Sequence, residues 1–449
     1  MKFEIDTQTL KDIEILDSHK SSFSVFNIFN QTRCVGGKDR LYTYLKNPLI
    51  NSTEIKKRSD AIAFFQELEF TSDLDIDKNT LDFIEHYLLQ EGYPTKPPSI
   101  IRTIEKSLYN KMKSSNSYYI IERGVDYTID LLNNLYNFSV KLKGTYCPEL
   151  IMEANTRIIE TFGLPEFKEI TRIKDMKKLG ALTIAKFDYI FRYTHRDTIR
   201  YFLDLIYDYD VFISVSGVAA ERGYSYSEIL PKDDHVIELE GLFHPSIPDP
   251  VSNHVNLSFD NNLLFITGSN MAGKSSLLKA MAIAVYLAHI GFPIPAAKSR
   301  ISLLNGIYTT INISDNLSLG YSHFYAEVLR IKHIAERLTQ ETNMLIVFDE
   351  LFRGTNVKDA YEGSLAIISA FSEIKGCFFA ISTHIIEVAE SLSENHSIQF
   401  LQMEVLNDKG FPEYTYLLKK GISDVRMGMY IIGKENVVQT IQSINKRTT

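Results

Sequence analysis

The spacing of apolar residues divides the chain into a helical part and an alternating part. Up to about residue 230, apolar residues recur at helical intervals, and glycine and proline are sparse from position 51 onward. The pattern predicts one helix over 120–140 and a longer one over 197–220, which Gly223 would end. A break is expected at 163–165, where Gly and Pro flank Leu.

From about residue 231, short apolar runs alternate with helical patterns, which is typical of a parallel α/β domain. The runs expected to form strands are Val236–Leu239, Leu263–Thr267, Gly306–Ile311, Met344–Phe348 and Cys377–Ser382. The sequence therefore predicts two domains. An all-helical domain would span 1–230, and a three-layer α/β domain would span 231–449.

Composition and charge limit which binding partners and which cellular compartment we expect for this chain. The 449 residues carry a formal net charge of −8, so overall charge does not draw the chain to nucleic acid, and any such contact needs a local basic surface. The cysteines Cys34, Cys147 and Cys377 lie far apart, which favours a reducing compartment over disulfides or a metal site. The N-terminus does not resemble a signal peptide, and no apolar run reaches membrane-spanning length. We therefore expect a cytoplasmic protein without a membrane partner.

The stretch LLFITGSNMAGKSSLL, residues 263–278, contains the phosphate-binding pattern G-x-x-x-x-G-K-[ST] between a predicted strand and a predicted helix. Glycines let successive backbone N–H groups point at phosphate oxygens, and the helix adds its positive end. Lys274 would reach the β- and γ-phosphates, and the Ser275 hydroxyl would ligate Mg²⁺. The residues expected to contact the nucleotide are Gly268, Ser269, Asn270, Met271, Ala272, Gly273, Lys274, Ser275 and Ser276. A glycine-rich turn before an ordinary helix is the weaker interpretation, because both flanking elements are present.

Two carboxylates, Asp349 and Glu350, directly follow the apolar run at 344–348. This is the Walker B arrangement. Asp349 would hold Mg²⁺ through water beside Ser275, and Glu350 would orient or deprotonate the attacking water. The separation of Asp349 from Lys274 along the sequence suits adjacent parallel strands. The alternative is a buried strand that ends in a solvated acidic turn.

His384 follows the run at 377–382, which should neighbour the Walker B strand, so its ring would sense the γ-phosphate. The alternative is an ordinary surface or core histidine. Between the two motifs, the polar segment 315–324 precedes a helical pattern at 326–338 and suggests a helix start or an ordinary loop.

Taken together, these segments resemble the MutS mismatch-repair ATPases, an ABC-type family. ITGSNMAGKSS resembles the family's phosphate loop, VFDELFRGTN its Walker B segment, STH its histidine switch, and DNLSLGYSHF its signature-like loop. IGFPIPA and GLFHP match further parts of the ATPase domain. IDTQTLKDIEI and FNQTRCVGGKDRLYTYLKNPL resemble the start of the helical core, while residues 50–195 match only as helical.

The resemblance implies an ATP- and Mg²⁺-dependent homodimer in which Ser322 caps the partner's γ-phosphate and the helical part serves as a lever. Residues 251–254 and 420–427 would flank the adenine. The chain begins where the family's helical core begins, so we expect it to lack the mismatch-reading and connector domains and to have a reduced or absent clamp. Ala272 and Ser276 stand where the family usually has glycine and threonine, and Tyr321 and His323 also depart from its pattern.

Three functions remain open on the sequence. The leading hypothesis is a dimeric ATPase switch that binds mismatched or branched DNA through its helical domain. The alternative is a switch that acts on a protein or ribonucleoprotein partner. DNA binding predicts a basic strip and a steep salt dependence, whereas a protein partner predicts an exposed apolar patch at the tips of the helical domain. An inactive scaffold is disfavoured because Lys274, Ser275, Asp349 and Glu350 are all present.

Overall fold

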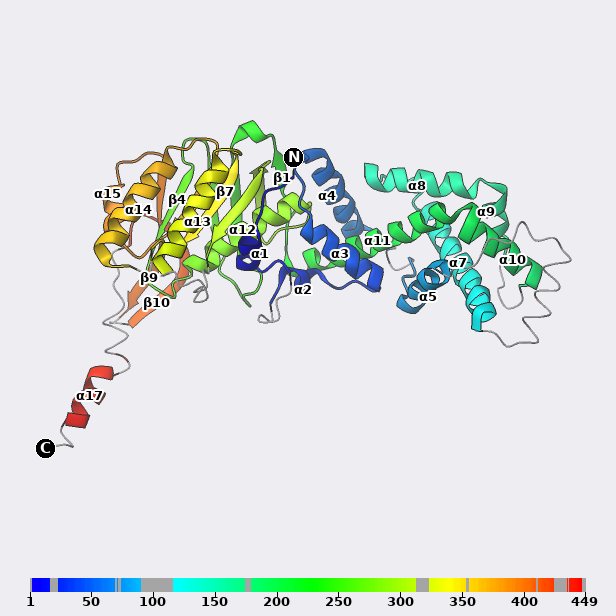
Figure 1. Ribbon diagram of the computed structural model, residues 1–449, viewed down its shortest axis with the longest axis horizontal. Coiled ribbons are helices and arrows are strands. Elements are labelled where there is room, and N and C mark those ends of the chain that lie inside the picture. Colours follow the sequence, from blue (N-terminus) through cyan, green and yellow to red (C-terminus); the bar gives the residue numbers. More distant parts are fainter. Residues whose placement is uncertain are drawn as a thin grey trace. The chain divides into compact units, whose positions relative to one another are not determined.

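The computed structural model describes the chain in two compact units (Figure 1). The described residues are 2–16, 23–68, 71, 74–89, 116–173, 179–311, 323–352, 355–408, 411–423, 434 and 436–445. Unit 1 comprises residues 1–25, 47–55 and 222–449, and unit 2 comprises residues 26–46 and 56–221. The first 25 residues, which the sequence places in the helical domain, thus lie in the same unit as the α/β part.

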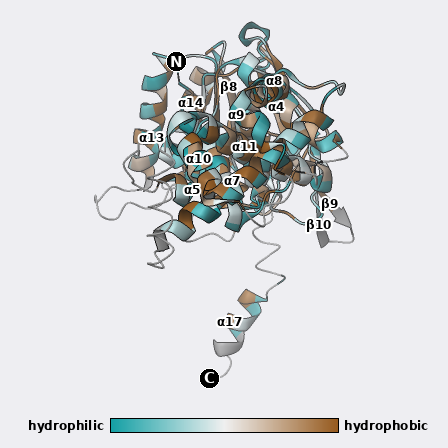
Figure 2. Cartoon of the chain, turned by 90° about the vertical axis from the view of Figure 1, so that its right-hand side faces the viewer, coloured by the Kyte–Doolittle hydropathy of each residue, from teal (hydrophilic) through white to brown (hydrophobic). Residues whose placement is uncertain are grey.

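The part of the chain before residue 223 is helical, as its periodicity predicts. Its helices are α1 (Thr7–Asp12), α2 (Val25–Phe29), α3 (Val35–Lys46), α4 (Ser52–Glu67), α5 (Lys78–Leu89), α7 (Asn116–Lys141), α8 (Glu149–Phe162), α9 (Pro165–Ile170), α10 (Ala181–Tyr189), the π-helical turn η3 (Ile190–Thr194) and α11 (Arg196–Arg222). The expected break is confirmed between α8 and α9, and Gly223 follows α11 with a φ of +66°. Teal and brown residues mix along these helices in Figure 2, as expected for amphipathic segments.

Unit 2 has an aromatic core and a buried carboxylate. The ring centroids of Phe65 and Tyr209 lie 5.1 Å apart, and Phe138 lies 6.0 Å from Tyr209. The buried Asp210 accepts hydrogen bonds from the backbone N–H groups of Arg33 (2.9 Å) and Cys34 (3.1 Å) just before α3. A carboxylate there satisfies N–H groups that would otherwise be buried without partners, and it complements the helix dipole.

Unit 1 is built on two sheets. Its strands are β1 (Glu228–Leu230), β2 (Ile237–Leu242), β3 (Asn253–Leu257), β4 (Leu263–Thr267), β5 (Lys298–Ser302), β6 (Gly306–Thr310), β7 (Met344–Asp349), β8 (Phe378–Ser382), β9 (Ile398–Asp408) and β10 (Phe411–Lys420). The larger sheet has the order β10-β9-β4-β8-β7-β6, in which only β10 is antiparallel to its neighbour. The smaller has the order β1-β5-β2-β3. The predicted fold class, a helical part followed by an α/β part, is confirmed.

Strand order corrects one detail of the sequence interpretation. β4 and β7, which carry the two phosphate-site motifs, are not adjacent, because β8 lies between them and pairs with both. All five predicted strands exist, but β1, β3, β5, β9 and β10 were not predicted. These strands are short or alternate apolar with polar residues, so they lack the continuous apolar run of a buried parallel strand.

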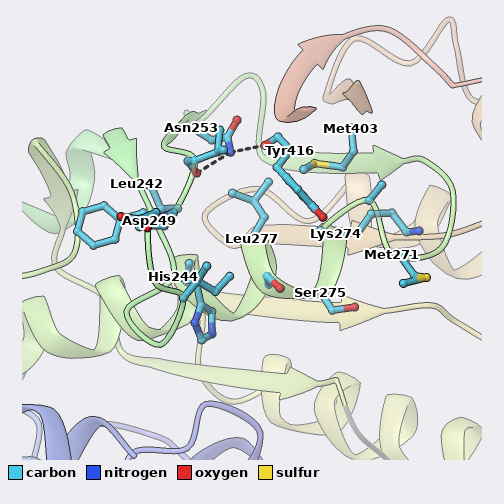
Figure 3. Close-up of a pocket in the computed structure, with 18 of the residues that line it drawn as sticks. Leu242, His244, Asp249, Asn253, Met271, Lys274, Ser275, Leu277, Met403 and Tyr416 are labelled. Atoms are coloured by element: carbon cyan, nitrogen blue, oxygen red, sulfur yellow. Dashed lines mark hydrogen bonds between the residues drawn. The ribbon is translucent and has the colours of Figure 1, made fainter. Parts of the chain in front are cut away.

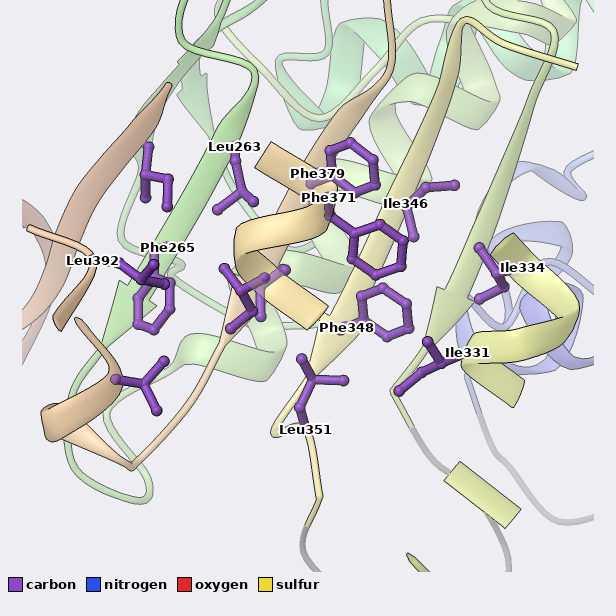
Figure 4. Packing of buried hydrophobic residues seen from close by; sticks show 14 of the residues in the cluster. Leu263, Phe265, Ile331, Ile334, Ile346, Phe348, Leu351, Phe371, Phe379 and Leu392 are labelled. Atoms are coloured by element: carbon purple, nitrogen blue, oxygen red, sulfur yellow. The ribbon is translucent and has the colours of Figure 1, made fainter. Parts of the chain in front are cut away.

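Helices pack on the larger sheet, and apolar side chains of the helices and strands form a hydrophobic core between them (Figure 4). The remaining helices of unit 1 are η4 (Lys232–Asp234), α12 (Lys274–Ile290), α13 (His323–Leu338), α14 (Val357–Ser372), α15 (Ile386–Ser391) and α17 (Val437–Asn445). Phe371 of α14 stacks on Phe379 of β8 at 4.9 Å and on Phe348 of β7 at 5.7 Å. Burying each such ring contributes about 1.5–3 kcal/mol, so this contact fixes α14 on the strands that carry the site. Across the described ranges, no helix is both long and apolar enough to cross a membrane.

The N-terminal segment adds to the free edge of the larger sheet. The backbone of Glu4 pairs with Gly306 of β6, and its carbonyl accepts from the Ile307 N–H at 2.9 Å. The buried Asp12 accepts from the Thr309 hydroxyl at 2.8 Å and from the Ile311 N–H at 2.9 Å. These bonds satisfy backbone groups that an open sheet edge would expose.

Asp6 ties this segment to α13, and its ionisation should make stability depend on pH. It accepts from the Thr9 N–H at 2.8 Å and forms an ion pair with Arg330. Burial acts to raise the pKa of Asp6, but the bonds from Arg330 and Thr9 outweigh it and hold the pKa below its usual value. We expect Asp6→Asn to lower the free energy of unfolding at pH 7 by about 1–3 kcal/mol.

The sign of the pH effect follows from the lowered pKa. The stabilisation is fully present above the pKa of Asp6 in the unfolded chain, about 3.9, and is lost as pH falls through the folded value. Urea unfolding from neutral pH down to about pH 3 should therefore show the gap between the two proteins closing below about pH 4. An equal gap at every pH would contradict this role, and Asp260→Asn, at an exposed position, is the control.

Candidate nucleotide-binding site

The loop after β4 adopts backbone conformations that its residues dictate. β4 is fully buried, and the loop has φ values of +145° at Gly268, +69° at Met271 and +100° at Gly273. A Cβ on Gly268 would lie 3.2 Å from the Cβ of Met403 in β9, so a side chain there would be both strained and crowded. Helix α12 begins directly after the loop at Lys274, and no side chain among the described residues caps it. The loop thus directs the N-terminus of a 17-residue helix at the site.

Two polar groups of the loop are placed for a ligand. The Lys274 amine is buried and donates to the carbonyls of Gly268 at 2.7 Å and Ser269 at 3.1 Å, so it lies inside the curl of the loop. The Ser269 hydroxyl is buried and has no hydrogen-bond partner in the described part of the chain. Because a buried hydroxyl without a partner costs free energy, it marks a place where a ligand oxygen fits.

Asp349 ends β7 between two hydroxyl groups. Its Oδ2 accepts from Ser275 Oγ of α12 at 2.5 Å, and its Oδ1 accepts from Ser382 Oγ of β8 at 2.5 Å. The second bond follows from the register, since Asp349 and Ser382 are partners on neighbouring parallel strands. The structure therefore brings the predicted metal residues Ser275 and Asp349 together. It adds Ser382, to which the sequence analysis gave no role.

Glu350 directly follows Asp349 in a left-handed conformation, with a φ of +55°. Its N–H donates to the Ser382 carbonyl at 3.1 Å, and this bond holds the turn. Its side chain is 17% exposed and lines the cavity described below. The Nδ1 atom of His384, which follows β8, lies 4.0 Å from the Glu350 carboxylate, and the His384 side chain is 53% exposed. A non-glycine residue at positive φ beside a cavity is typical of functional sites.

A cavity of about 690 Å³ opens in front of the loop (Figure 3). From the loop and α12 it is lined by Asn270, Met271, Ala272, Gly273, Lys274, Ser275, Ser276, Leu277 and Ala280. Residues 242–244 and 247–251 together with Asn253 form another wall, and Met403 and Tyr416 come from β9 and β10. Such a volume is in the usual range for small-molecule sites.

The cavity lining includes one of the two segments that we expect to flank the base. Val251 and Asn253, from the segment 251–254, line the cavity. Lys420 does not line it but borders a different cavity, and residues 424–427 lie outside the described part of the chain. β10 reaches the site through Tyr416 instead, because its register shifts between Tyr414 and Leu418.

His244 lines the same cavity from the loop after β2. Burial lowers the pKa of its imidazole to about 4, and the charge of Lys279 acts in the same direction. Its Nδ1 lies 2.9 Å from the Ser246 hydroxyl. At neutral pH the cavity therefore holds an uncharged imidazole, which does not compete with Lys274 for an anion. Ser322, predicted to act across a dimer interface, lies outside the described residues.

The residues present fit a nucleoside triphosphate with a divalent metal. The buried Ser269 hydroxyl, the Lys274 amine and the start of α12 suit phosphate oxygens. The Ser275 hydroxyl and the Asp349 carboxylate meet at 2.5 Å and offer the hard oxygen donors that Mg²⁺ prefers. This fit rests on donor chemistry and burial.

Comparison with known proteins gives the same assignment for the C-terminal part. Residues 264–448 match the family described as MutS domain V. The chain is 30% identical over 232 residues to the DNA mismatch repair protein MutS of Shouchella clausii, which covers 50% of this chain and 26% of the relative. It is 34% identical over 221 residues to that of Aquifex pyrophilus, covering 48% and 25%, respectively.

A longer match extends toward the N-terminus. The MutS of Ehrlichia ruminantium is 25% identical over 329 residues, which covers 73% of this chain and 38% of the relative. The chain thus spans about a quarter to two fifths of the length of these relatives. The matched family, the phosphate loop and the Walker B geometry agree with one another. Residues 264–448 therefore form a MutS domain V, the ABC-type ATPase domain of the MutS family.

Proposed function

We propose that this protein binds and hydrolyses ATP with Mg²⁺ and uses the cycle as a dimeric switch acting on DNA. The observation that carries the proposal is the cluster at the ends of β4, β7 and β8. There Lys274 lies inside the phosphate loop, Ser275 and Asp349 meet at 2.5 Å, and Glu350 faces the same cavity. These groups supply the charges and donors that phosphoryl transfer to water requires.

Each residue of the cluster has a distinct task in this proposal. The loop amides and Lys274 bind the phosphates, and Lys274 balances charge that develops on the γ-phosphate. Ser275 and Asp349 hold Mg²⁺, and Ser382 orients the Asp349 carboxylate through its 2.5 Å bond. Mg²⁺, when bound, neutralises charge on the phosphate oxygens. Glu350 orients the attacking water and accepts its proton, and His384, 4.0 Å away, responds to the γ-phosphate.

The cavity wall also suggests how the base is held. Tyr416 and Val251 both line the cavity, and an aromatic ring is the usual partner of a flat base. We assign Tyr416 to the base side of the site and the residues from Gly268 to Ser276 to the phosphate side. This assignment fills the gap left by the sequence, which offered no stacking residue.

The proposed partner of the ATPase domain is a second copy of the chain. Ser322, directly before α13, would contact the γ-phosphate bound by the partner, as the family resemblance implies. ATP would then favour the paired state through contacts that ADP cannot make, and hydrolysis would relax it. The three free cysteines are consistent with a cytoplasmic location.

DNA is the proposed substrate because the similar proteins are DNA mismatch repair proteins by name. With a net charge of −8, contact with DNA needs local basic residues on the helical unit, without sequence readout. The binding would then depend steeply on salt.

The test is the ATPase rate with and without mismatched or branched duplex DNA, at low and moderate salt. We expect DNA to stimulate turnover and salt to reduce that stimulation, because the phosphate contacts release counterions. Perfectly paired duplex of the same length is the control for structure-specific binding. A rate indifferent to all of these nucleic acids would contradict DNA as the substrate.

Exposed apolar side chains on unit 2 favour one alternative, a protein or ribonucleoprotein partner. Tyr146, Leu89 and Met152 are exposed by 92%, 66% and 54%, respectively. Large exposed apolar residues fit a protein surface better than a phosphate backbone. In that case turnover would respond to the partner and not to DNA.

A further inference from the structure

Strand β10 departs from regular pairing at the point where it reaches the nucleotide cavity. Tyr414 pairs with Val405, and Leu418 pairs with Met403. Between these two pairs β10 advances by four residues while β9 advances by only two, so β10 bulges. Within this bulge, Tyr416 has a φ of +58°, in the left-handed region. For a bulky side chain this conformation is strained, and it persists only where surrounding contacts impose it.

The Asn253 side chain supplies those contacts. Its Nδ2 donates to the Tyr416 carbonyl at 2.9 Å, and its Oδ1 accepts from the Leu418 N–H at 2.7 Å. Asn253 is only 7% exposed and begins β3, a strand of the other sheet. One amide therefore satisfies two backbone groups of the bulge, a donor and an acceptor, and Figure 3 shows the bond to Tyr416 as a dashed line. The carboxamide offers a donor and an acceptor at once, whereas an ionised carboxylate of the same size offers acceptors alone.

The bulge places Tyr416 against the phosphate loop. A Cβ on Gly273 would lie 3.3 Å from Cδ1 of the Tyr416 ring and 3.4 Å from Cε of Met403. Tyr416 is 46% exposed and lines the cavity. Asn253 also stands two residues after Val251, and its Nδ2 lies 3.4 Å from the Val251 carbonyl. The buried Asn253 side chain thus bonds both to the segment at Val251 and to the bulge at Tyr416, the two parts of the lining that we assign to the base.

We propose that Asn253 is a positioning residue for the nucleotide: it fixes the bulge of β10 and so holds the Tyr416 ring where it closes the cavity over the base and ribose. The proposal rests on ATP binding at this site. Asn253 acts through Tyr416, and the phosphate side does not depend on it. Loss of the amide should therefore weaken binding of whole nucleotides and spare ligands that consist of phosphates alone.

The experiment compares the full chain with Asn253→Ala, Asn253→Asp, Tyr416→Gly and the double variant Asn253→Ala/Tyr416→Gly. Dissociation constants are measured by calorimetry for a non-hydrolysable ATP analogue and for inorganic tripolyphosphate. We expect Asn253→Ala to weaken analogue binding about tenfold and tripolyphosphate binding by less than about twofold. Asn253→Asp keeps the size but cannot donate to the Tyr416 carbonyl, so it should also weaken analogue binding.

The double variant separates positioning from general stability. If Asn253 acts through Tyr416, the double variant should bind the analogue no more weakly than Tyr416→Gly alone, because the ring that Asn253 positions is already gone. Steady-state turnover should show a raised KM with little change in kcat. Asn256→Ala, at an exposed position of the same strand, is the matched control.

Three results would overturn the inference: analogue binding unchanged in both Asn253 variants, tripolyphosphate binding lost in parallel, or additive losses in the double variant. Each presupposes a wild-type chain that binds the analogue. A wild-type chain that binds neither ligand would instead overturn the proposed function, and this inference with it. The two failures are therefore distinguishable.

Discussion

Replacing Lys274 with alanine is expected to weaken ATP binding severely. The Lys274 amine lies inside the phosphate loop, where it donates to the carbonyls of Gly268 and Ser269, and it is the group best placed to meet the β- and γ-phosphates. Loss of a charge-assisted hydrogen bond to phosphate in a buried site costs about 1.5–3 kcal/mol, and the loop also loses its internal tie. We expect affinity to fall roughly 100-fold, measured by calorimetry with the non-hydrolysable analogue.

The matched control is Lys279→Ala. Lys279 lies on the same helix, but its amine is 3.6 Å from the Glu14 carboxylate and it does not line the cavity. Circular dichroism of both variants shows whether α12 and the sheet remain folded. Tight binding by a folded Lys274→Ala protein would mean that the phosphate loop has been misassigned.

Replacing Glu350 with glutamine should separate binding from hydrolysis. The change keeps size and the backbone turn at +55° but removes the carboxylate that orients and deprotonates water. Removal of a general base typically lowers kcat by about 100-fold or more, while the phosphate contacts through Lys274 and Ser275 are untouched. We expect near-normal ATP affinity with turnover nearly lost, and a dimer that accumulates with ATP, visible by light scattering.

Glu390→Gln, an exposed position on α15, controls for the loss of a carboxylate near the same sheet. If Glu350→Gln hydrolyses ATP at the wild-type rate, Glu350 has no role as a base. Normal hydrolysis combined with weak binding would point instead to a role in holding the nucleotide.

Sequence reasoning predicted the parts of the site that local pattern determines. The phosphate loop lies between an apolar run and a helix start, and the structure has β4 and α12 at those positions. Likewise, the apolar run before Asp349 forms β7, and the run before His384 forms β8. Buried parallel strands need continuous apolar residues, so such segments can be recognised without tertiary information.

The remaining parts depend on pairings between distant segments. The contact of Ser382 with Asp349 requires that β8 lie beside β7 in one particular register, which periodicity does not specify. Tyr416 reaches the cavity because Asn253, 163 positions earlier in the chain, holds an irregular strand. The N-terminal segment bonds to β6 across some 300 positions, through Thr9 and Asp12. The local pattern of a single sequence gives no sign of these long-range contacts.

The most direct test of the account is release of inorganic phosphate from Mg²⁺·ATP by the wild-type chain, followed beside Lys274→Ala and Glu350→Gln. The account predicts many turnovers per chain for the wild type, dependence on Mg²⁺ that a chelator removes, and near-complete loss in both variants. Phosphate release that persists in both variants would show that the activity comes from elsewhere. A folded wild-type chain that binds ATP but releases no phosphate would contradict the hydrolytic role of Glu350 and leave a protein that only binds the nucleotide.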